Sequence, residues 1–143
     1  MNKIIRKIFS TRFLDVIPFT IFSIYLFTRY WVQSETLFLS LFILISGLAL
    51  WYSGLFYLGK NFHGFSEPKT LITSGIYSKI SHPIYLGAIL SFIGLSIFSK
   101  HTFIILVTLI LIPLQLIRAS VEQKKLEQKY GEKYIKYKKG TWL

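Results

Sequence analysis

Residues 36–59 read TLFLSLFILISGLALWYSGLFYLG, a run of 24 residues that contains no charged side chain and no histidine. A helix needs about 20 predominantly apolar residues to cross the hydrocarbon core of a bilayer. Charged residues, Glu35 and Lys60, directly flank the run on its two sides. This stretch is therefore predicted to be a membrane-spanning helix.

Three further apolar blocks predict helices of the same kind: residues 13–31, 83–99 and 102–117. Only Lys100 and His101 separate the last two blocks, which reach roughly 24–26 Å each at about 1.5 Å per residue and so barely span. A re-entrant hairpin is the alternative, but it would leave Lys100 in hydrocarbon, which is costly. The sequence therefore favours an all-α integral membrane protein of about four transmembrane helices, with a tight hairpin of the last two.

The basic residues are distributed very unevenly around these four blocks. The chain has 17 Lys and Arg against 6 Asp and Glu, a net charge of +11. With four spans, 15 of the 17 fall before the first block, in residues 60–82 or in residues 118–143, and only Arg29 and Lys100 fall on the other side. The positive-inside rule then predicts a multi-pass protein of the cell (inner) membrane with both termini cytoplasmic.

Composition narrows the other possibilities. A chain of 143 residues is long enough for one domain, and the lysines flank apolar spans, so membrane lipids are the expected counter-charge and no nucleic acid partner is expected. There is no cysteine, and His63, His82 and His101 lack the spacing of metal ligands, so no metal site is predicted. The basic start before the first block resembles a signal peptide, but no small-residue cleavage site follows, which favours a retained span.

The last segment, residues 118–143, is polar and periodic. Four of its residues share one helix face because they fall at successive i+4 steps: Arg118, Glu122, Leu126 and Tyr130. Gly131 is predicted to end or kink this helix. Tyr134 and Tyr137 follow among lysines, a pattern typical of a segment that lies against a membrane surface. We therefore expect a C-terminal cytoplasmic amphipathic helix.

Two groups of residues could carry chemistry on the cytoplasmic side. His82-Pro83 opens the third block, so His82 would lie at a helix N-terminus, where free N–H groups can hold a carboxylate. Arg118 and Glu122 follow the fourth block directly. Each group also has an ordinary interpretation, as an interfacial histidine at a helix start and as a solvated intrahelical ion pair. One tight hairpin separates the two groups, so the four-span topology predicts that they are neighbours.

The two groups belong to two longer motifs. The first is Leu71-x-x-Ser74-Gly75-x-Tyr77-x-x-x-x-His82-Pro83-x-Tyr85-x-Gly87, and the second is Arg118-x-x-x-Glu122-Gln123-x-x-Leu126 followed by Tyr130-Gly131-x-x-Tyr134-x-x-Tyr137. They resemble the hallmarks G-x-Y-x-x-x-R-H-P-x-Y-x-G, R-x-x-x-E-E-x-x-L and F-G-x-x-Y-x-x-Y of the isoprenylcysteine carboxyl methyltransferase and phospholipid methyltransferase superfamily. The resemblance covers about residues 59–139.

This resemblance implies an integral membrane methyltransferase that uses S-adenosylmethionine and modifies a small hydrophobic or lipid-like acceptor. It implies catalytic roles for Arg118, which would face the substrate, and His82. It also implies that the cofactor is bound by the loop, by the H-P-x-Y residues and by the glutamate, which here are Lys69, Thr70, Leu71, Ile72, Tyr77, His82, Pro83, Ile84, Tyr85 and Glu122.

Two positions depart from the family pattern. Ser81 stands where the family usually has arginine, and Gln123 where it usually has a second glutamate. These changes leave open a non-catalytic relative that binds lipid or a partner helix. The acceptor atom, which could belong to a carboxylate, a thiol or an amine, and the oligomeric state are not predicted by the sequence.

Overall fold

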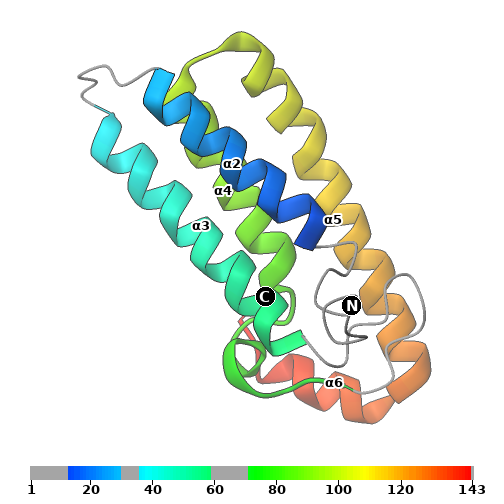
Figure 1. The fold of residues 1–143 in the computed structure, drawn as a ribbon. Coiled ribbons are helices and arrows are strands. Elements are labelled where there is room, and N and C mark those ends of the chain that lie inside the picture. The colour runs from blue at the N-terminus through cyan, green and yellow to red at the C-terminus, as the bar shows by residue number, and fades with distance from the viewer. Residues whose placement is uncertain (1–12, 30–35, 59–70, 143) are drawn as a thin grey trace, which may run out of the picture.

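The computed structural model describes residues 13–29, 36–58 and 71–142, and within them it contains helices and no strands. Its elements are α2 (Phe13–Arg29), α3 (Leu37–Leu58), the 3-10 helix η2 (Gly75–Ser78), α4 (Pro83–Ser99), α5 (Thr102–Tyr130) and α6 (Glu132–Lys139). Helices α2 to α5 run side by side, and the short α6 lies across one end of them (Figure 1). The predicted all-α class is confirmed for these residues.

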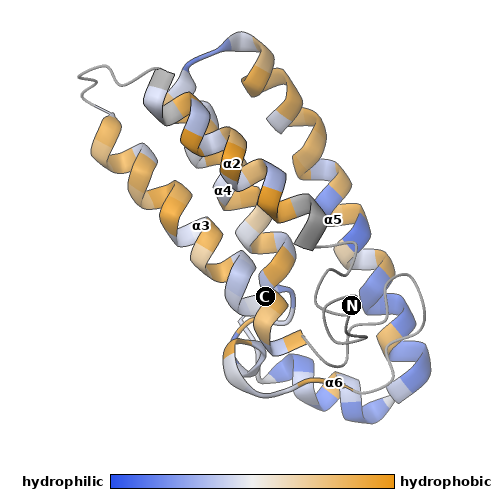
Figure 2. Ribbon diagram, in the orientation of Figure 1, coloured by the Kyte–Doolittle hydropathy of each residue, from blue (hydrophilic) through white to orange (hydrophobic). Residues whose placement is uncertain are grey.

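Two of the helices, α3 and α5, are long and apolar enough to cross a membrane by length and composition. Residues 16–26 of α2 and the whole of α4 form shorter apolar helices. Figure 2 shows that hydrophobic residues cover the four long helices, whereas hydrophilic residues gather on α6 and on the part of α5 that leads to it. The polar end of the molecule is thus the end at which α6 lies.

Helices α3 and α4 approach so closely that their backbones touch. Glycines stand seven residues apart on both helices: Gly47 and Gly54 on α3, Gly87 and Gly94 on α4. A Cβ atom added at Gly87 would lie 2.5 Å from the backbone nitrogen of Trp51, and one at Gly94 would lie 2.5 Å from that of Leu44. Small residues that admit such an approach are typical of helix pairs in membranes.

Helix α2 covers this pair through aromatic contacts. The ring of Phe19 lies 5.7 Å from that of Trp51 on α3 and 4.5 Å from that of Phe92 on α4, in tilted and edge-to-face arrangements. The hydroxyl groups of Thr20 and Tyr52 are 3.1 Å apart. One side of α2 is therefore bound to α3 and α4.

The C-terminal part of the chain differs from the expectation of a separate tail helix. Residues 118–130 continue α5, which runs through Pro113 without a break as one helix of 29 residues. The change from apolar to polar residues at Arg118 alters the surroundings of the helix, but it does not interrupt the backbone hydrogen bonds. Gly131 ends the helix as predicted, with a φ of +52° that favours glycine, and the chain then turns into α6.

Candidate cofactor site

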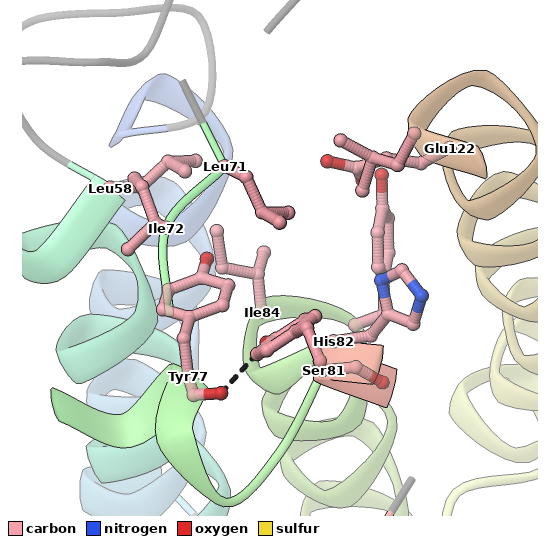
Figure 3. Close-up of a pocket in the computed structure, with 11 residues that line it drawn as sticks. Leu58, Leu71, Ile72, Tyr77, Ser81, His82, Ile84 and Glu122 are labelled. Carbon is pink, nitrogen blue, oxygen red and sulfur yellow. Dashed lines mark hydrogen bonds between the residues drawn. The ribbon is translucent and has the colours of Figure 1, made fainter. Parts of the chain in front are cut away.

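A pocket opens at the polar end of the helices, where the two motifs meet (Figure 3). Its walls come from the end of α3, the segment before α4, the first turn of α4, one face of α5, and α6. The lining residues are Leu58, Leu71, Ile72, Tyr77, Ser81, His82, Ile84, Tyr85, Glu122, Leu126 and Tyr137. The cavity measures about 40 Å³, room for a few water molecules, so a nucleoside would have to widen it.

The first wall is shaped by the Gly75-x-Tyr77 part of the first motif. Gly75 has a φ of +62°, and a Cβ atom there would overlap the ring of Tyr57, so both the turn and the space require glycine. The short helix η2 that starts at this residue carries Tyr77, whose side chain is buried. Its hydroxyl donates a hydrogen bond to the carbonyl oxygen of Gly54 at 3.4 Å, which ties the loop to α3.

The second wall is the start of α4. His82 is the N-cap residue, and its carbonyl oxygen accepts the first helical hydrogen bond, from the nitrogen of Leu86 at 3.1 Å. Pro83 occupies the first turn, where its missing N–H costs nothing. The His82 and Tyr85 rings are 5.9 Å apart. The N–H groups of Ile84 and Tyr85, which precede the helical hydrogen-bond ladder, belong to the residues that line the pocket.

The third wall is the polar half of α5. Glu122 and Leu126, one turn apart, both line the pocket, which confirms that the i+4 spacing puts them on one face. Glu122 thereby joins His82, as the four-span topology predicted. Arg118 lies one turn before Glu122, is exposed and does not line the pocket.

The fourth wall is α6, which turns back onto the loop of the first motif. The hydroxyl of Tyr137 donates a hydrogen bond of 2.7 Å to the carbonyl oxygen of Tyr77, and the nitrogen of Trp142 donates one of 2.8 Å to that of Lys79. Tyr134 is completely buried. The two tyrosines are therefore directed inward by the turn at Gly131 and are not the side chains with which this segment would contact a membrane surface.

Burial also changes the acidity of these two phenols. It raises the pKa of Tyr134 to about 12, with smaller contributions from the negative charges of Glu127 and then Glu122. Burial, and secondarily the neighbouring Tyr134, raises the pKa of Tyr137 to about 12 as well. The fold therefore favours the neutral form of both side chains.

This leads to a prediction for alkaline pH. The pKa of Tyr134 rises from 10.0 to about 12 on folding, so its stabilising contribution is complete below pH 10 and is lost as the pH rises through 12. Tyr134→Phe should therefore lose less stability than the wild type between pH 10 and 12, as measured by thermal unfolding in detergent. Because the Tyr134 hydroxyl has no hydrogen-bond partner among the described residues, the variant should be at least as stable at pH 7. Equal alkaline losses in both proteins would contradict this account.

Seven of the predicted cofactor residues line the pocket: Leu71, Ile72, Tyr77, His82, Ile84, Tyr85 and Glu122. Pro83 is buried against Gly54 and does not line it. Lys69 and Thr70 lie outside the described residues. Sequence reasoning missed Leu58, Ser81, Leu126 and Tyr137 as lining residues. Leu126 had a signal in the spacing, since it shares a helix face with Glu122, and Ser81 and Tyr137 had one in their places within the two motifs.

Within the described segments, no three His, Asp or Glu side chains gather as they would around a metal ion. The polar groups at the pocket, among the described residues, are a carboxylate, an imidazole, hydroxyl groups and the N-terminus of a helix. Such a set suits an organic ligand that has charged ends and an aromatic part.

The described residues thus form apolar helices with a polar pocket at one end, where the two motifs that resemble membrane methyltransferases meet. A family model that describes phospholipid methyltransferases matches residues 35–133, more than two thirds of the chain. The chain therefore belongs to the phospholipid methyltransferase family, and this family together with the apolar helices indicates a membrane protein. Searches of curated proteins and of solved structures found no significant match.

Proposed function

We propose that this protein is an integral membrane enzyme that transfers a methyl group from S-adenosylmethionine to a small hydrophobic or lipid-like acceptor. One observation carries the proposal beyond family membership. Residues of the first motif and Glu122 of the second, which are separated in sequence by most of α4 and much of α5, line the same pocket. Neither segment alone offers both an anion-binding helix start and a carboxylate.

The chemistry of the pocket fits the parts of this cofactor. Glu122 suits the ammonium group, and His82 with the N-terminus of α4 suits the carboxylate. The aromatic faces of Tyr77 and Tyr85 suit the adenine or, through cation–π contact, the sulfonium. The two charged ends of the amino-acid part and an aromatic or cationic part of the cofactor thus have candidate partners among the lining residues.

S-adenosylmethionine, when bound, supplies an electrophilic methyl group, so the chain has mainly to align the acceptor with it and to exclude water. A carboxylate or thiolate acceptor needs no base, whereas an amine must lose a proton. His82, which lines the pocket, is proposed to take that proton. Arg118, exposed one turn from Glu122, is proposed to bind the polar group of the acceptor, which would enter from the bilayer.

The proposal includes a topology in which α2, α3, α4 and α5 all span the membrane. Its support is the charge distribution, because 15 of the 17 Lys and Arg then face one side. Both termini and the pocket would be cytoplasmic. A reporter enzyme that is active only in the cytoplasm should therefore work when fused after Leu143 and fail when inserted between Lys100 and His101. Activity at the inserted position would contradict four spans.

Turnover can be tested with S-adenosylmethionine labelled in the methyl group. Purified protein in nanodiscs made from a total bacterial lipid extract should move label into the organic-soluble fraction, and Glu122→Ala should abolish the transfer. Cofactor binding without transfer to any lipid, thiol or fatty-acid acceptor would favour the non-catalytic relative. The departures at Ser81 and Gln123 are the observations that favour that alternative.

A further inference from the structure

Ser81 lies in the wall of the pocket and carries a buried hydroxyl group, for which the proposed function gives no role. Its side chain is only 6% exposed, and its Oγ atom has no hydrogen-bond partner among the described residues. It lines the pocket together with His82 and Glu122, and Figure 3 shows it next to His82. Leaving a buried hydroxyl unpaired costs about 1–3 kcal/mol, so such groups in native proteins call for an explanation.

The position of Ser81 in the chain suggests what the partner is. Ser81 directly precedes His82, the N-cap residue of α4, a helix of 17 residues. The N-terminus of a helix carries a partial positive charge and N–H groups without helical partners, both of which favour an anion. An unpaired hydroxyl at this helix end is a further hydrogen-bond donor for the same anion.

The opposite wall restricts the choice of anion. Glu122 also lines the pocket, and its carboxylate would repel a simple anion such as phosphate. A zwitterion avoids this repulsion when its ammonium group faces Glu122 and its carboxylate faces α4. The amino-acid part of S-adenosylmethionine is such a zwitterion.

We infer that the hydroxyl of Ser81 donates a hydrogen bond to the carboxylate of S-adenosylmethionine at the N-terminus of α4. The inference rests on the proposed function and deepens it. The family that the two motifs resemble usually has arginine at this position, whereas here a neutral hydroxyl and the N-terminus of α4 would hold the carboxylate. Ser81 then explains how the site can work without that cation.

Two ligands and two alanine variants test the inference. S-adenosylhomocysteine has the amino-acid part, whereas methylthioadenosine lacks it and keeps the nucleoside. In calorimetric titrations, Ser81→Ala should weaken the binding of S-adenosylhomocysteine by about 10- to 100-fold, as expected for a lost hydrogen bond to a charged group. The affinity for methylthioadenosine should stay unchanged. Ser78→Ala is the matched control, because Ser78 is exposed, lies outside the pocket and donates to the carbonyl oxygen of Gly75 at 2.7 Å.

A second pair of variants separates hydrogen bonding from packing. Threonine and valine have nearly the same shape and differ by one hydroxyl, so Ser81→Thr should bind S-adenosylhomocysteine more tightly than Ser81→Val while both bind methylthioadenosine equally. Equal affinities of these two variants for S-adenosylhomocysteine would overturn the inference and leave the proposed function standing. Equal weakening of both ligands by Ser81→Ala would overturn the carboxylate assignment. A wild-type protein that binds neither ligand would contradict the proposed function itself.

Discussion

Glu122→Ala should weaken the binding of S-adenosylhomocysteine by about 30-fold or more. The pocket is proposed to hold the ammonium group of the ligand against this carboxylate, and removing one partner of a desolvated charge pair costs about 2–5 kcal/mol. Glu122→Gln, which keeps the shape and loses the charge, should weaken binding almost as much. Isothermal titration of the detergent-purified variants measures both effects.

Three further variants test whether the loss of affinity is specific to residues that line the pocket. Glu127→Ala is the control for charge, because Glu127 is a half-buried glutamate of the same helix that does not line the pocket. His82→Ala should also weaken the ligand substantially, since His82 lines the pocket. Arg118→Ala should largely spare the ligand while impairing turnover. A loss of affinity for Arg118→Ala equal to that for Glu122→Ala would show that the acceptor role given to Arg118 is wrong.

The second large effect is expected where α3 and α4 touch. Gly87→Ala should destabilise the protein by about 3 kcal/mol or more, the upper part of the range for overpacking. The added methyl carbon would lie 2.5 Å from the backbone nitrogen of Trp51 and 2.7 Å from the carbonyl oxygen of Gly47. Backbone atoms cannot turn away as a side chain can, so the helices would have to separate.

A loss of stability on Gly87→Ala would be specific to this contact, because alanine normally stabilises a helix relative to glycine by about 1 kcal/mol. Gly140→Ala is the matched control: its added Cβ would meet its closest neighbour, the carbonyl oxygen of Tyr137, at an ordinary 3.4 Å. Thermal unfolding in detergent should show a large fall in the midpoint for Gly87→Ala and little change for Gly140→Ala. A Gly87→Ala protein as stable as the wild type would contradict the close packing of α3 and α4.

The sequence predicted both ends of α4 correctly because residues at the ends themselves determine them. Proline favours a first helical turn, and α4 begins at Pro83. Its far end is marked by Lys100, a charged residue with the positive φ that stops a helix. The division of α5 into a span that ends at residue 117 and a separate tail helix was wrong, since the polar residues from Arg118 onward mark where the apolar surface ends and not where the helix ends. The backbone signal for that end is Gly131.

The sequence also predicted part of the candidate site. The i+4 rule put Glu122 and Leu126 on one face, and the predicted hairpin between the two motifs brought that face next to His82. The inward position of Tyr137 depends on the direction in which α6 leaves Gly131, and no periodicity in the sequence encodes that direction. The burial of Ser81 depends on the path of the loop from Gly75 to Pro83, which tertiary contacts such as Tyr77 to Gly54 determine.

The central claim is that the two motifs form one site for S-adenosylmethionine, and the most direct test is a titration of the wild-type protein with S-adenosylhomocysteine. The account predicts saturable binding with one site per chain. It also predicts loss of affinity when either wall is altered, by His82→Ala on α4 or by Glu122→Ala on α5. No binding at millimolar ligand, or binding that survives both substitutions, would contradict it.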